Sequence, residues 1–426
     1  MNQSLAQATR LVAASLAMLA ILLVGCAYPP PELPAADDTI ESRGGLSWPW
    51  RGAISGLLKY RVWTEARSGY VALIARDGRV EHGYTVGYQD VEAEIPMSME
   101  TRFRMASMTK PVTAVAAMIL VEEGKLSLDD PVSKYLPSFG EMRVALNPET
   151  DGELETTEQS PLMLVRHLLS FVSGIGGGGW EPTTTVARQH QENNIYNGEG
   201  SLEDRIDRLA AVTLYEQPGT RWRYGSSLDV IARIVEIASG EAFDDFLRAR
   251  IFRPLGMDAT YFPKNLPEGV PLANLYTQNE DGDLVLSSRS SFHAADWTPG
   301  GSGLVSTAPD YMRFALMLWN RGEYNGVRIL KAETVDEMTR LHVPSGVLQD
   351  FGIEGLGFGL GVSVMADEDA ALIPGHNGDF WWSGAHGTHF WISPETGVVV
   401  VVLLQNAMGP HAGLPVAPYL VQGLAN

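Results

Sequence analysis

Strand-forming sequence at both ends of the chain, with helical sequence between them, is the feature that most constrains its fold. Residues 69–88 are rich in β-branched and aromatic residues and are interrupted by Asp77-Gly78, a pair typical of tight hairpins. Residues 357–364 show a strand-like alternation, and residues 388–404 contain two further strand-like runs around a turn. Strands from both ends of a chain can pair in one antiparallel sheet. The sequence therefore predicts an α/β (α+β) protein in which helices flank that sheet.

Helical periodicity dominates the middle of the chain. From Ser227 to Ser239 the apolar residues fall at positions 228, 231, 234, 235 and 238, and Gly240 follows as a stop signal. We also expect helices over residues 161–170, 242–252 and 311–321. The pattern predicts an α/β region at residues 51–140 and 290–426, and a mainly helical region at residues 141–289.

One segment in the first half of the chain suggests chemistry. Ser107 and Lys110 lie three residues apart, just before an apolar run over residues 112–124 that ends at a glycine. Residues three apart share one face of a helix, so the hydroxyl and the amine can meet. Burial of the lysine there favours its neutral amine, which can take the serine proton and create a nucleophile. The positive end of the helix dipole adds to this activation.

The S-x-x-K motif is too short to be specific by itself. A serine at an exposed helix start followed by a solvated lysine has the same sequence.

The overall composition of the chain narrows the choice of function. The apolar content of 45% and charged content of 19% are those of a folded globular protein. A formal charge of −20 argues against nucleic acid as a partner, because phosphate binding needs a basic face.

The N-terminus has the features of a bacterial lipoprotein. Residues 11–25 are an apolar signal-peptide core, short for a bilayer span, and they lead to Leu23-Val24-Gly25-Cys26, which resembles a lipobox. We predict a signal peptide at residues 1–25, a lipid on Cys26 and a proline-rich tether over residues 26–50. Lipid on Cys26 would anchor the protein in the bacterial cell envelope, on the periplasmic or extracellular side. The alternative is an uncleaved membrane anchor with an incidental cysteine.

Two further segments can contribute to a site around Ser107. Tyr224 lies in Arg221-Trp222-Arg223-Tyr224-Gly225-Ser226, directly before the helix that starts at Ser227. A neighbouring cation would favour the phenolate of such a tyrosine as a general base. The other segment is Trp381-Trp382-Ser383-Gly384-Ala385, which precedes the penultimate predicted strand.

These three landmarks, in this order, resemble the serine β-lactamase and penicillin-binding-protein superfamily. Three other segments strengthen the resemblance to the class C β-lactamase-like branch, and most closely to family VIII carboxylesterases: residues 166–175, 252–257 and 300–307. The similarity runs from about residue 55 to the C-terminus. It implies a β-lactamase/transpeptidase-like fold and a serine hydrolase domain over residues 51–426.

The resemblance also implies roles for individual residues. Ser107 would be the nucleophile, and Lys110 with Tyr224 would form the proton-transfer pair. Backbone N–H groups of Ser107 and Ala385 would form the oxyanion hole. The residues implied to bind substrate are Trp382, Ser383, Gly384 and Ser226. No cofactor and no metal are implied.

The chain departs from the β-lactamase pattern at three places. Trp382-Ser383-Gly384 stands where β-lactamases carry Lys-Thr-Gly, which removes the cation that pairs with the β-lactam carboxylate. Ser226 stands where they carry an amide-bearing Asn, and Phe171-Val172 replaces the usual His-Thr. We therefore predict a serine carboxylesterase that forms an acyl-enzyme on Ser107. Its small-molecule substrates would be esters with short to medium acyl chains, and β-lactam hydrolysis would be weak.

Several other functions are alternatives to this one. A β-lactamase or a D-alanyl-D-alanine peptidase-like enzyme is the nearest alternative, and a catalytically silent binding lipoprotein is an alternative of another class. An α/β-hydrolase needs G-x-S-x-G, and no serine of this chain has glycine both two residues before it and two residues after it. A zinc hydrolase would have to use His376, His386 and His389, which lack a recognisable ligand spacing.

Overall fold

The computed structural model describes the following residues: 48–64, 67–177, 182–195, 199–287, 296–344, 354–407 and 416–425. Cys26, the predicted signal peptide and most of the predicted tether lie outside the described residues. The domain limits drawn from the sequence therefore stay predictions. No helix among the described residues is both long enough and apolar enough to span a membrane.

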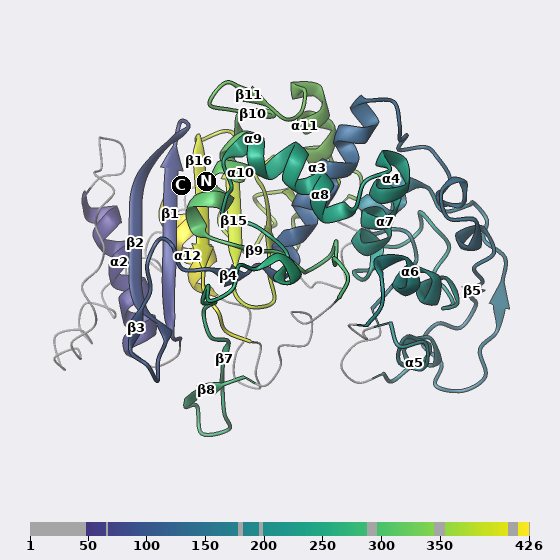
Figure 1. Ribbon diagram of the computed structural model, residues 1–426, viewed down its shortest axis with the longest axis horizontal. Coiled ribbons are helices and arrows are strands. Elements are labelled where there is room, and N and C mark those ends of the chain that lie inside the picture. The colour runs from purple at the N-terminus through teal and green to yellow at the C-terminus, as the bar shows by residue number, and fades with distance from the viewer. Residues whose placement is uncertain are drawn as a thin grey trace, which may run out of the picture.

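Strands from the two ends of the chain form one sheet of eight antiparallel strands (Figure 1). Their spatial order is β12 (Leu356–Phe358), β13 (Ser363–Met365), β14 (Phe380–Ser383), β15 (His389–Ser393), β16 (Val398–Leu403), β1 (Gly69–Arg76), β2 (Arg79–Asp90) and β3 (Ile95–Pro96). The central pairing of β1 with β16 places Leu73 opposite Val401 and so joins sequence from opposite ends of the chain. The predicted α/β fold with a shared sheet is confirmed.

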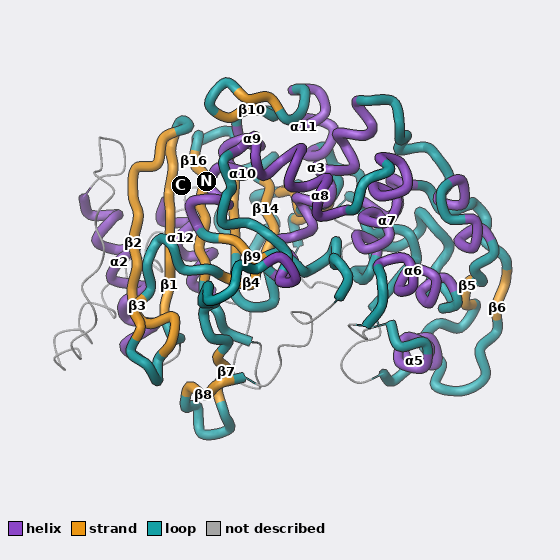
Figure 2. The backbone as a smooth tube through the Cα atoms, in the orientation of Figure 1, coloured by secondary structure: helices purple, strands orange, loops and turns teal. Residues whose placement is uncertain are grey.

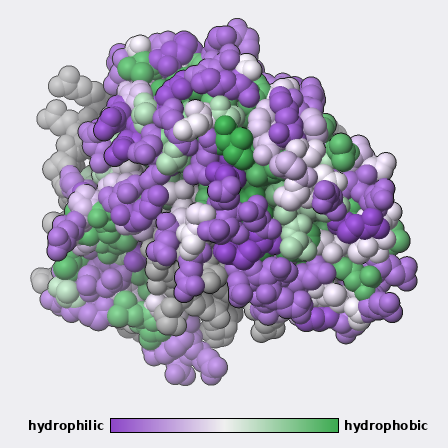
Figure 3. All heavy atoms as spheres, turned by 45° about the vertical axis from the view of Figure 1, so that its right-hand side comes forward, coloured by the Kyte–Doolittle hydropathy of each residue, from purple (hydrophilic) through white to green (hydrophobic). Residues whose placement is uncertain are grey.

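Helices cover both faces of the centre of this sheet. Helix α10 (Ala308–Trp319) contacts β16, β1 and β15, while α12 (Val416–Ala425) contacts β16 and also α2 (Trp48–Trp63). All six residues of β16 are buried, as expected for a strand with neither face in water. The outer surface is different: hydrophilic side chains cover much of the face in Figure 3, with hydrophobic side chains in patches.

The helical part of the molecule lies beside the sheet, with α3 (Thr109–Glu122) between them (Figures 1 and 2). Its helices are α4 (Val165–Leu169), α5 (Thr185–Glu192), α6 (Leu202–Ala210), α7 (Ser227–Ser239), α8 (Phe243–Leu247) and α9 (Arg253–Leu255). The short strand pair of β5 (Val144–Ala145) with β6 (Thr156–Thr157) lies in this part. The pair of β7 (Tyr276–Gln278) with β8 (Leu284–Leu286) lies instead below the sheet in Figure 1, where Tyr276 bridges to Asn406. Helix α3 is buried along nearly its whole length and packs on α7, so it connects the two parts.

Local predictions succeeded where the chain signals its own stops. Helix α7 spans the predicted Ser227–Ser239, and the hairpin of β1 and β2 turns at Asp77-Gly78. The single strand predicted at residues 357–364 is wrong. It is a hairpin of β12 and β13, because Gly361 adopts a positive φ of 80° that reverses the chain.

Three predicted helices have different bounds in the structure, because sequence periodicity does not reveal how a helix begins and ends. The helix expected at residues 161–170 is reduced to α4, and the one expected at 311–321 begins earlier, at Ala308. Thr307 explains the earlier start, because its side chain accepts a hydrogen bond from the Asp310 amide as an N-cap. The helix expected at 242–252 is α8 followed by a π-helical turn over Arg248–Phe252.

Candidate active site

Ser107 lies in a 3₁₀ turn, Ala106–Met108, that leads directly into α3. Hydrogen bonds hold the residues on either side of it: the Met105 amide donates to Leu304 O at 2.8 Å, and Thr388 Oγ1 donates to Met105 O at 2.9 Å. On the other side Met108 O accepts a 2.8 Å hydrogen bond from Tyr311 Oη. The serine backbone is therefore fixed from the sheet, from α10 and from the loop before β9 (Val305–Ser306).

Ala106 precedes the serine with a φ of 48°, a left-handed conformation that non-glycine residues rarely adopt. Strained backbone of this kind persists where surrounding contacts hold it and is concentrated at functional sites. The strain makes the chain turn sharply just before Ser107, whose side chain is half-buried. This geometry was not foreseen from the sequence, because nothing in Met105-Ala106-Ser107 signals a left-handed residue.

The three residues singled out in the sequence meet at the serine hydroxyl. Ser107 Oγ lies 3.0 Å from Lys110 Nζ and 2.7 Å from Tyr224 Oη. Lys110 reaches the serine across one turn of helix, while Tyr224 comes from the segment that enters α7. A hydroxyl can donate one hydrogen bond and accept others, so the proton of Ser107 has a partner within reach on each side.

Lys110 is held on all sides. Its Nζ also donates to Gly301 O at 2.6 Å and lies 4.6 Å from the centre of the Tyr224 ring. Only 4% of the residue is exposed to solvent. The solvated lysine of the alternative interpretation is therefore excluded by the structure.

Aromatic side chains surround the tyrosine. The Tyr224 ring centroid lies 5.0 Å from that of Phe171, 6.0 Å from that of Trp222 and 5.6 Å from that of Trp382. Phe358 completes the group, 5.2 Å from Trp382 in an edge-to-face arrangement. We call these five residues the aromatic cluster. Such contacts favour fixed ring orientations, so the cluster restricts the direction of the Tyr224 hydroxyl.

The strand segment Trp382-Ser383-Gly384 lies beside the serine turn at the end of β14. At Gly384 an added Cβ would lie 2.4 Å from Met105 O and 3.2 Å from Ala106 Cβ. No other residue fits there without displacing the backbone beside the nucleophile. The close approach brings Trp382 and Ala385 to the same site as Ser107, although they lie far from it in sequence.

A model of the family described as Beta-lactamase matches residues 52–425. The chain belongs to the β-lactamase family.

Individual relatives of the chain sharpen this assignment. Protein Rv1367c of Mycobacterium tuberculosis is 32% identical over 350 residues, which cover 80% of this chain and 86% of the relative. Esterase EstB of Burkholderia gladioli is 30% identical, covering 81% and 88%. The solved structure of EstCE1, described as a hydrolase with promiscuous acyltransferase activity, superposes with a TM-score of 0.76 at 27% identity, covering 88% and 98%.

The predicted β-lactamase/transpeptidase-like fold and the resemblance to family VIII carboxylesterases are confirmed by these matches. The protein is a serine hydrolase of the β-lactamase family.

Two of the residues predicted to bind substrate have their hydroxyls engaged by other side chains. Ser383 Oγ lies 2.8 Å from His389 Nδ1 and 3.4 Å from Tyr419 Oη. Burial lowers the pKa of His389 to about 3, so the imidazole is neutral at neutral pH. Ser226 Oγ accepts a 3.3 Å hydrogen bond from Arg205 Nη2.

Ala385, predicted to lend its amide to an oxyanion hole, is exposed and directly follows Gly384. Throughout the described residues its backbone N–H donates to no backbone carbonyl. The amide of Ser107 is likewise without a backbone acceptor in that part of the chain. Both donors are thus available to a group bound at the serine.

The three histidines of the zinc alternative have separate partners. His376 Nδ1 lies 3.7 Å from Glu368 Oε2, whereas His389 contacts Ser383. Burial and the nearby Arg104 lower the pKa of His386 to about 4. In the described parts of the chain no group of three or more His, Cys, Asp or Glu side chains could hold a metal ion.

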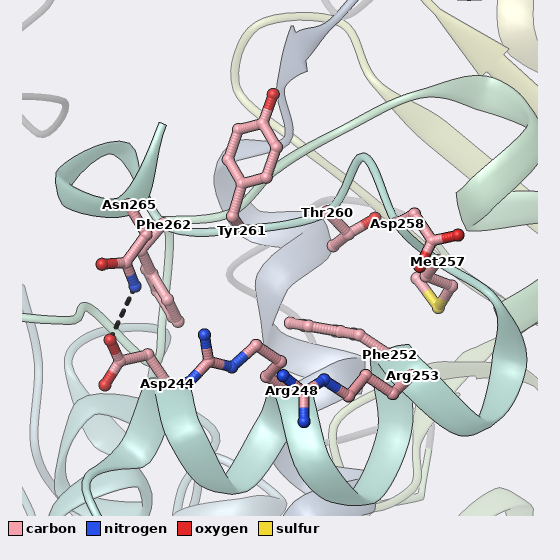
Figure 4. Close-up of a pocket in the computed structure, with 10 residues that line it drawn as sticks. All are labelled: Asp244, Arg248, Phe252, Arg253, Met257, Asp258, Thr260, Tyr261, Phe262 and Asn265. Carbon is pink, nitrogen blue, oxygen red and sulfur yellow. Dashed lines mark hydrogen bonds between the residues drawn. The ribbon is translucent and has the colours of Figure 1, made fainter. Parts of the chain in front are cut away.

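A cavity of about 230 Å³ lies away from Ser107, between α8, the π-helical turn and the segment that follows α9 (Figure 4). Its walls combine charged and aromatic side chains, among them Asp244, Arg248 and Phe262. No residue of the serine site lines it. It therefore offers no alternative centre for the hydrolase chemistry.

The sequence interpretation missed a buried ion pair next to Lys110. Arg205 Nη2 lies 3.1 Å from Asp229 Oδ2, and Asp229 Oδ1 accepts a 2.8 Å hydrogen bond from the Gly301 amide. A signal was present for the arginine. In α6 it lies on the buried face between Leu202 and Leu209, where an unpartnered charge is costly.

Proposed function

We propose that the protein is a serine carboxylesterase that hydrolyses short- to medium-chain acyl esters through an acyl-enzyme on Ser107. The observation that carries the proposal is the contact of Ser107 Oγ with both Lys110 Nζ and Tyr224 Oη. A serine needs a neighbouring base to become a nucleophile, and among the described residues these are the two side chains within hydrogen-bond distance of its hydroxyl. The similarity to esterase EstB supports an ester as the substrate.

The geometry supports a two-step reaction. As Ser107 Oγ attacks the ester carbonyl, its proton passes to the pair formed by Lys110 and Tyr224, which returns it to the departing alcohol. Water then attacks the acyl-enzyme and gives a proton to the same pair, which passes it to Ser107 Oγ as the acid is released and the free serine is restored. The N–H groups of Ser107 and Ala385 would stabilise the negative oxygen of each tetrahedral intermediate.

The β14 side of the site favours uncharged substrates. The half-buried indole of Trp382 stands where a cation would be needed to pair with a carboxylate, and the nearby hydroxyl of Ser383 contacts His389. Apolar and aromatic surface of this kind gains most from binding an uncharged acyl or alkyl group. β-Lactams and D-alanyl-D-alanine peptides carry a carboxylate and would bind less well.

Acyl transfer to an alcohol is a second candidate activity. The acyl-enzyme can pass its acyl group to any nucleophile that reaches it, and EstCE1 is described as having promiscuous acyltransferase activity. The aromatic cluster supports this candidate, because an apolar wall holds an alcohol better than it holds water. Adding short alcohols to an ester assay and measuring the new ester by gas chromatography tests it, and release of free acid alone would reject it.

We also propose that Cys26 carries lipid and that the tether holds the domain at a membrane of the bacterial cell envelope. The lipobox-like Leu23-Val24-Gly25-Cys26 motivates this location. Labelled palmitate should enter the full-length protein in a bacterial host, and Cys26→Ala should abolish the labelling. A chain without residues 1–26 should be soluble and fully active. Full-length protein that takes up no palmitate would contradict the anchor.

Covalent labelling of Ser107 tests the main proposal. Intact-mass spectrometry after treatment with a fluorophosphonate should show one adduct on the wild type and none on Ser107→Ala. Hydrolysis of p-nitrophenyl esters of increasing chain length should exceed that of nitrocefin, and Ser107→Ala should lose several orders of magnitude in kcat. An adduct that persists on the alanine variant would refute the assignment. A wild type without any adduct would instead favour a catalytically silent binding lipoprotein.

A further inference from the structure

The loop that anchors Lys110 is clamped by two side chains. Gly300 O accepts a 2.6 Å hydrogen bond from Thr113 Oγ1, and the Gly301 amide donates to Asp229 Oδ1 at 2.8 Å. Both groups belong to the same peptide unit, so its plane is fixed at its carbonyl from α3 and at its N–H from α7. The carbonyl of Gly301 itself accepts from Lys110 Nζ at 2.6 Å.

Asp229 also lies close to the lysine. A Cβ placed on Gly301 would be 3.3 Å from Asp229 Oδ1 and 3.5 Å from Lys110 Nζ, so both side chains approach this glycine from the same side. A carboxylate near a lysine stabilises the positive charge of the ammonium group. An ammonium group cannot accept the proton of Ser107, so an unbalanced Asp229 would oppose catalysis.

Arg205 supplies the opposing charge. Its side chain is 2% exposed, that of Asp229 is 8% exposed, and the two lie 3.1 Å apart. The same Nη2 donates to Ser226, two residues after Tyr224, and the guanidinium lies 4.7 Å from the ring centre of Trp297. Arg205 thus connects the Asp229 carboxylate with the segment that carries the tyrosine.

Stability alone is a poor explanation for this pair. Removing two charges from water costs several kcal/mol per ion, and apolar residues of similar volume often serve as well or better in a core. A buried pair beside a catalytic lysine is better explained by what it does to that lysine.

We propose that Asp229 and Arg205 are positioning residues for Lys110. Asp229 holds the Gly300–Gly301 peptide so that the Gly301 carbonyl fixes the lysine at Ser107, and Arg205 cancels the negative charge that this hydrogen bond brings with it. The inference rests on the proposed proton transfer from Ser107 to Lys110 and Tyr224.

Several titratable or charged groups face the lysine or its helix start. Tyr224 and Asp229 approach from the segment that enters α7 and from its first turn, and Arg205 stands behind Asp229 on α6. Tyr311 from α10 donates to Met108 O, and full burial raises its pKa well above the ordinary range, so it stays neutral. Substitution can therefore change the charge near Lys110 by altering the balance between Asp229 and Arg205.

The test is the pH dependence of acylation in three variants. Asp229→Asn keeps an oxygen for the Gly301 amide but leaves Arg205 unbalanced, which disfavours the protonated lysine. The rising acid limb of kcat/KM should then move to lower pH, by about one unit. Arg205→Gln leaves the carboxylate unbalanced, so its limb should move to higher pH by about the same amount. The double variant should return close to the wild-type limb.

The measurement uses a p-nitrophenyl ester and, independently, the rate at which a fluorophosphonate labels Ser107. KM should change less than about threefold, because neither residue touches substrate, whereas kcat should fall. The matched control is the exposed ion pair between Arg321 and Asp336, whose neutralised variants should leave the limb in place.

Conservative variants cover the case in which Arg205→Gln does not fold. Arg205→Lys keeps the positive charge and should keep the wild-type limb with a lower kcat, while Asp229→Asn alone must still shift it downward. If the acid limb of kcat/KM stays in place, or shifts in the same direction in both single variants, the positioning role is overturned. The proposed function still stands in that case, provided that the fluorophosphonate labels Ser107. A wild type whose Ser107 is not labelled overturns the proposed function as well, so the two failures are distinguishable.

Discussion

The two walls of the active site differ in how they use their polar groups. On the wall formed by α3, α7 and the segment that enters α7, Lys110 and Tyr224 donate hydrogen bonds to Ser107, and Asp229 accepts one from the Gly301 amide in the loop beside it. On the wall formed by β14, the hydroxyl of Ser383 contacts His389, and Trp382 presents an aromatic ring. In the proposed mechanism the first wall transfers protons, whereas the second offers mainly shape and apolar surface.

This difference shows how a hydrolase of the β-lactamase family can change its substrates without changing its chemistry. In the proposed mechanism, activation of the serine depends on short contacts across one helical turn and on a peptide unit clamped between two helices. Recognition of the substrate would depend on side chains at the end of one strand, where replacement would alter what binds and leave the nucleophile in place. The comparison predicts that substitutions on the α3–α7 wall act mainly on kcat, and those on the β14 wall act mainly on selectivity.

The largest effect is expected on the α3–α7 wall. Lys110→Ala and Tyr224→Phe should each lower kcat by about 10²- to 10⁴-fold, because each removes half of one proton-transfer pair. The double variant should be little worse than the poorer single variant, since residues that act as a unit give non-additive losses. Steady-state kinetics on one p-nitrophenyl ester would measure all three.

A matched pair elsewhere provides the control. Lys134 Nζ lies 5.2 Å from the ring centre of Tyr135, the same type of contact as between Lys110 and Tyr224, but the Lys134 side chain is exposed and bonds to Asp130. Lys134→Ala and Tyr135→Phe should leave kcat within about twofold of the wild type. Fully additive losses at Lys110 and Tyr224 would mean that the two act independently and would break the proposed unit.

The next effect concerns the selectivity of the β14 wall. Trp382→Lys introduces the cation that a β-lactam carboxylate needs, and a charge-assisted hydrogen bond is worth about 1.5–3 kcal/mol. The ratio of kcat/KM for nitrocefin to that for a short ester should therefore rise roughly 10- to 150-fold. Part of the change should come from weaker ester hydrolysis, because the aromatic surface beside Tyr224 is lost.

Trp382→Phe separates the two causes, since it keeps an aromatic wall without a cation. Its ester activity should stay close to the wild type and its nitrocefin activity should not rise. If the wild type already hydrolyses nitrocefin as fast as a short ester, the protein is a β-lactamase and the argument from Trp382 is wrong.

A feature of the fold or of the site could be predicted from the sequence when it depends on residues that are close together in the chain. The spacing of Ser107 and Lys110 is set by one turn of helix, and α7 has its own stop signal, so both could be predicted. Tyr224 was a candidate from its position directly before α7, but its pairing with Lys110 came from the resemblance to a family. Asp229, Arg205 and Gly301 could not be predicted as partners, because their contacts depend on how α6, α7 and a distant loop pack. The roles implied for Ser383 and Ser226 stay predictions, and the observed contacts of their hydroxyls weaken them.

A smaller effect is expected on stability in acid. The folded protein keeps His389 neutral down to a pKa of about 3 because of burial, whereas an unfolded histidine binds a proton near pH 6.5. The unfolded state therefore holds the extra proton between these values, and stability is lost as the pH falls through that window. The slope contributed is about 1.4 kcal/mol per pH unit for one proton.

Replacing the histidine tests this slope. His389→Asn should show a shallower loss of unfolding free energy between pH 5.5 and pH 4, measured by urea denaturation. Tyr419→Phe serves as the control, because it removes a neighbouring hydroxyl 3.4 Å from Ser383 and keeps the titrating group. Equal slopes in His389→Asn and the wild type would show that His389 does not cause the loss of unfolding free energy in acid.

The smallest effect is predicted for Ser383, and it tests the comparison most directly. Because its Oγ lies 2.8 Å from a neutral imidazole, the hydroxyl already has a partner when an ester arrives. Ser383→Ala should therefore change kcat/KM for esters by less than about threefold, while the free energy of unfolding falls by about 1 kcal/mol through loss of one hydrogen bond. Kinetics and urea denaturation on the same preparation measure both quantities. A tenfold or greater rise in KM at unchanged stability would mean that Ser383 leaves His389 to bind the substrate. The β14 wall would then recognise esters through a polar contact, and the contrast between the two walls would fail at this residue.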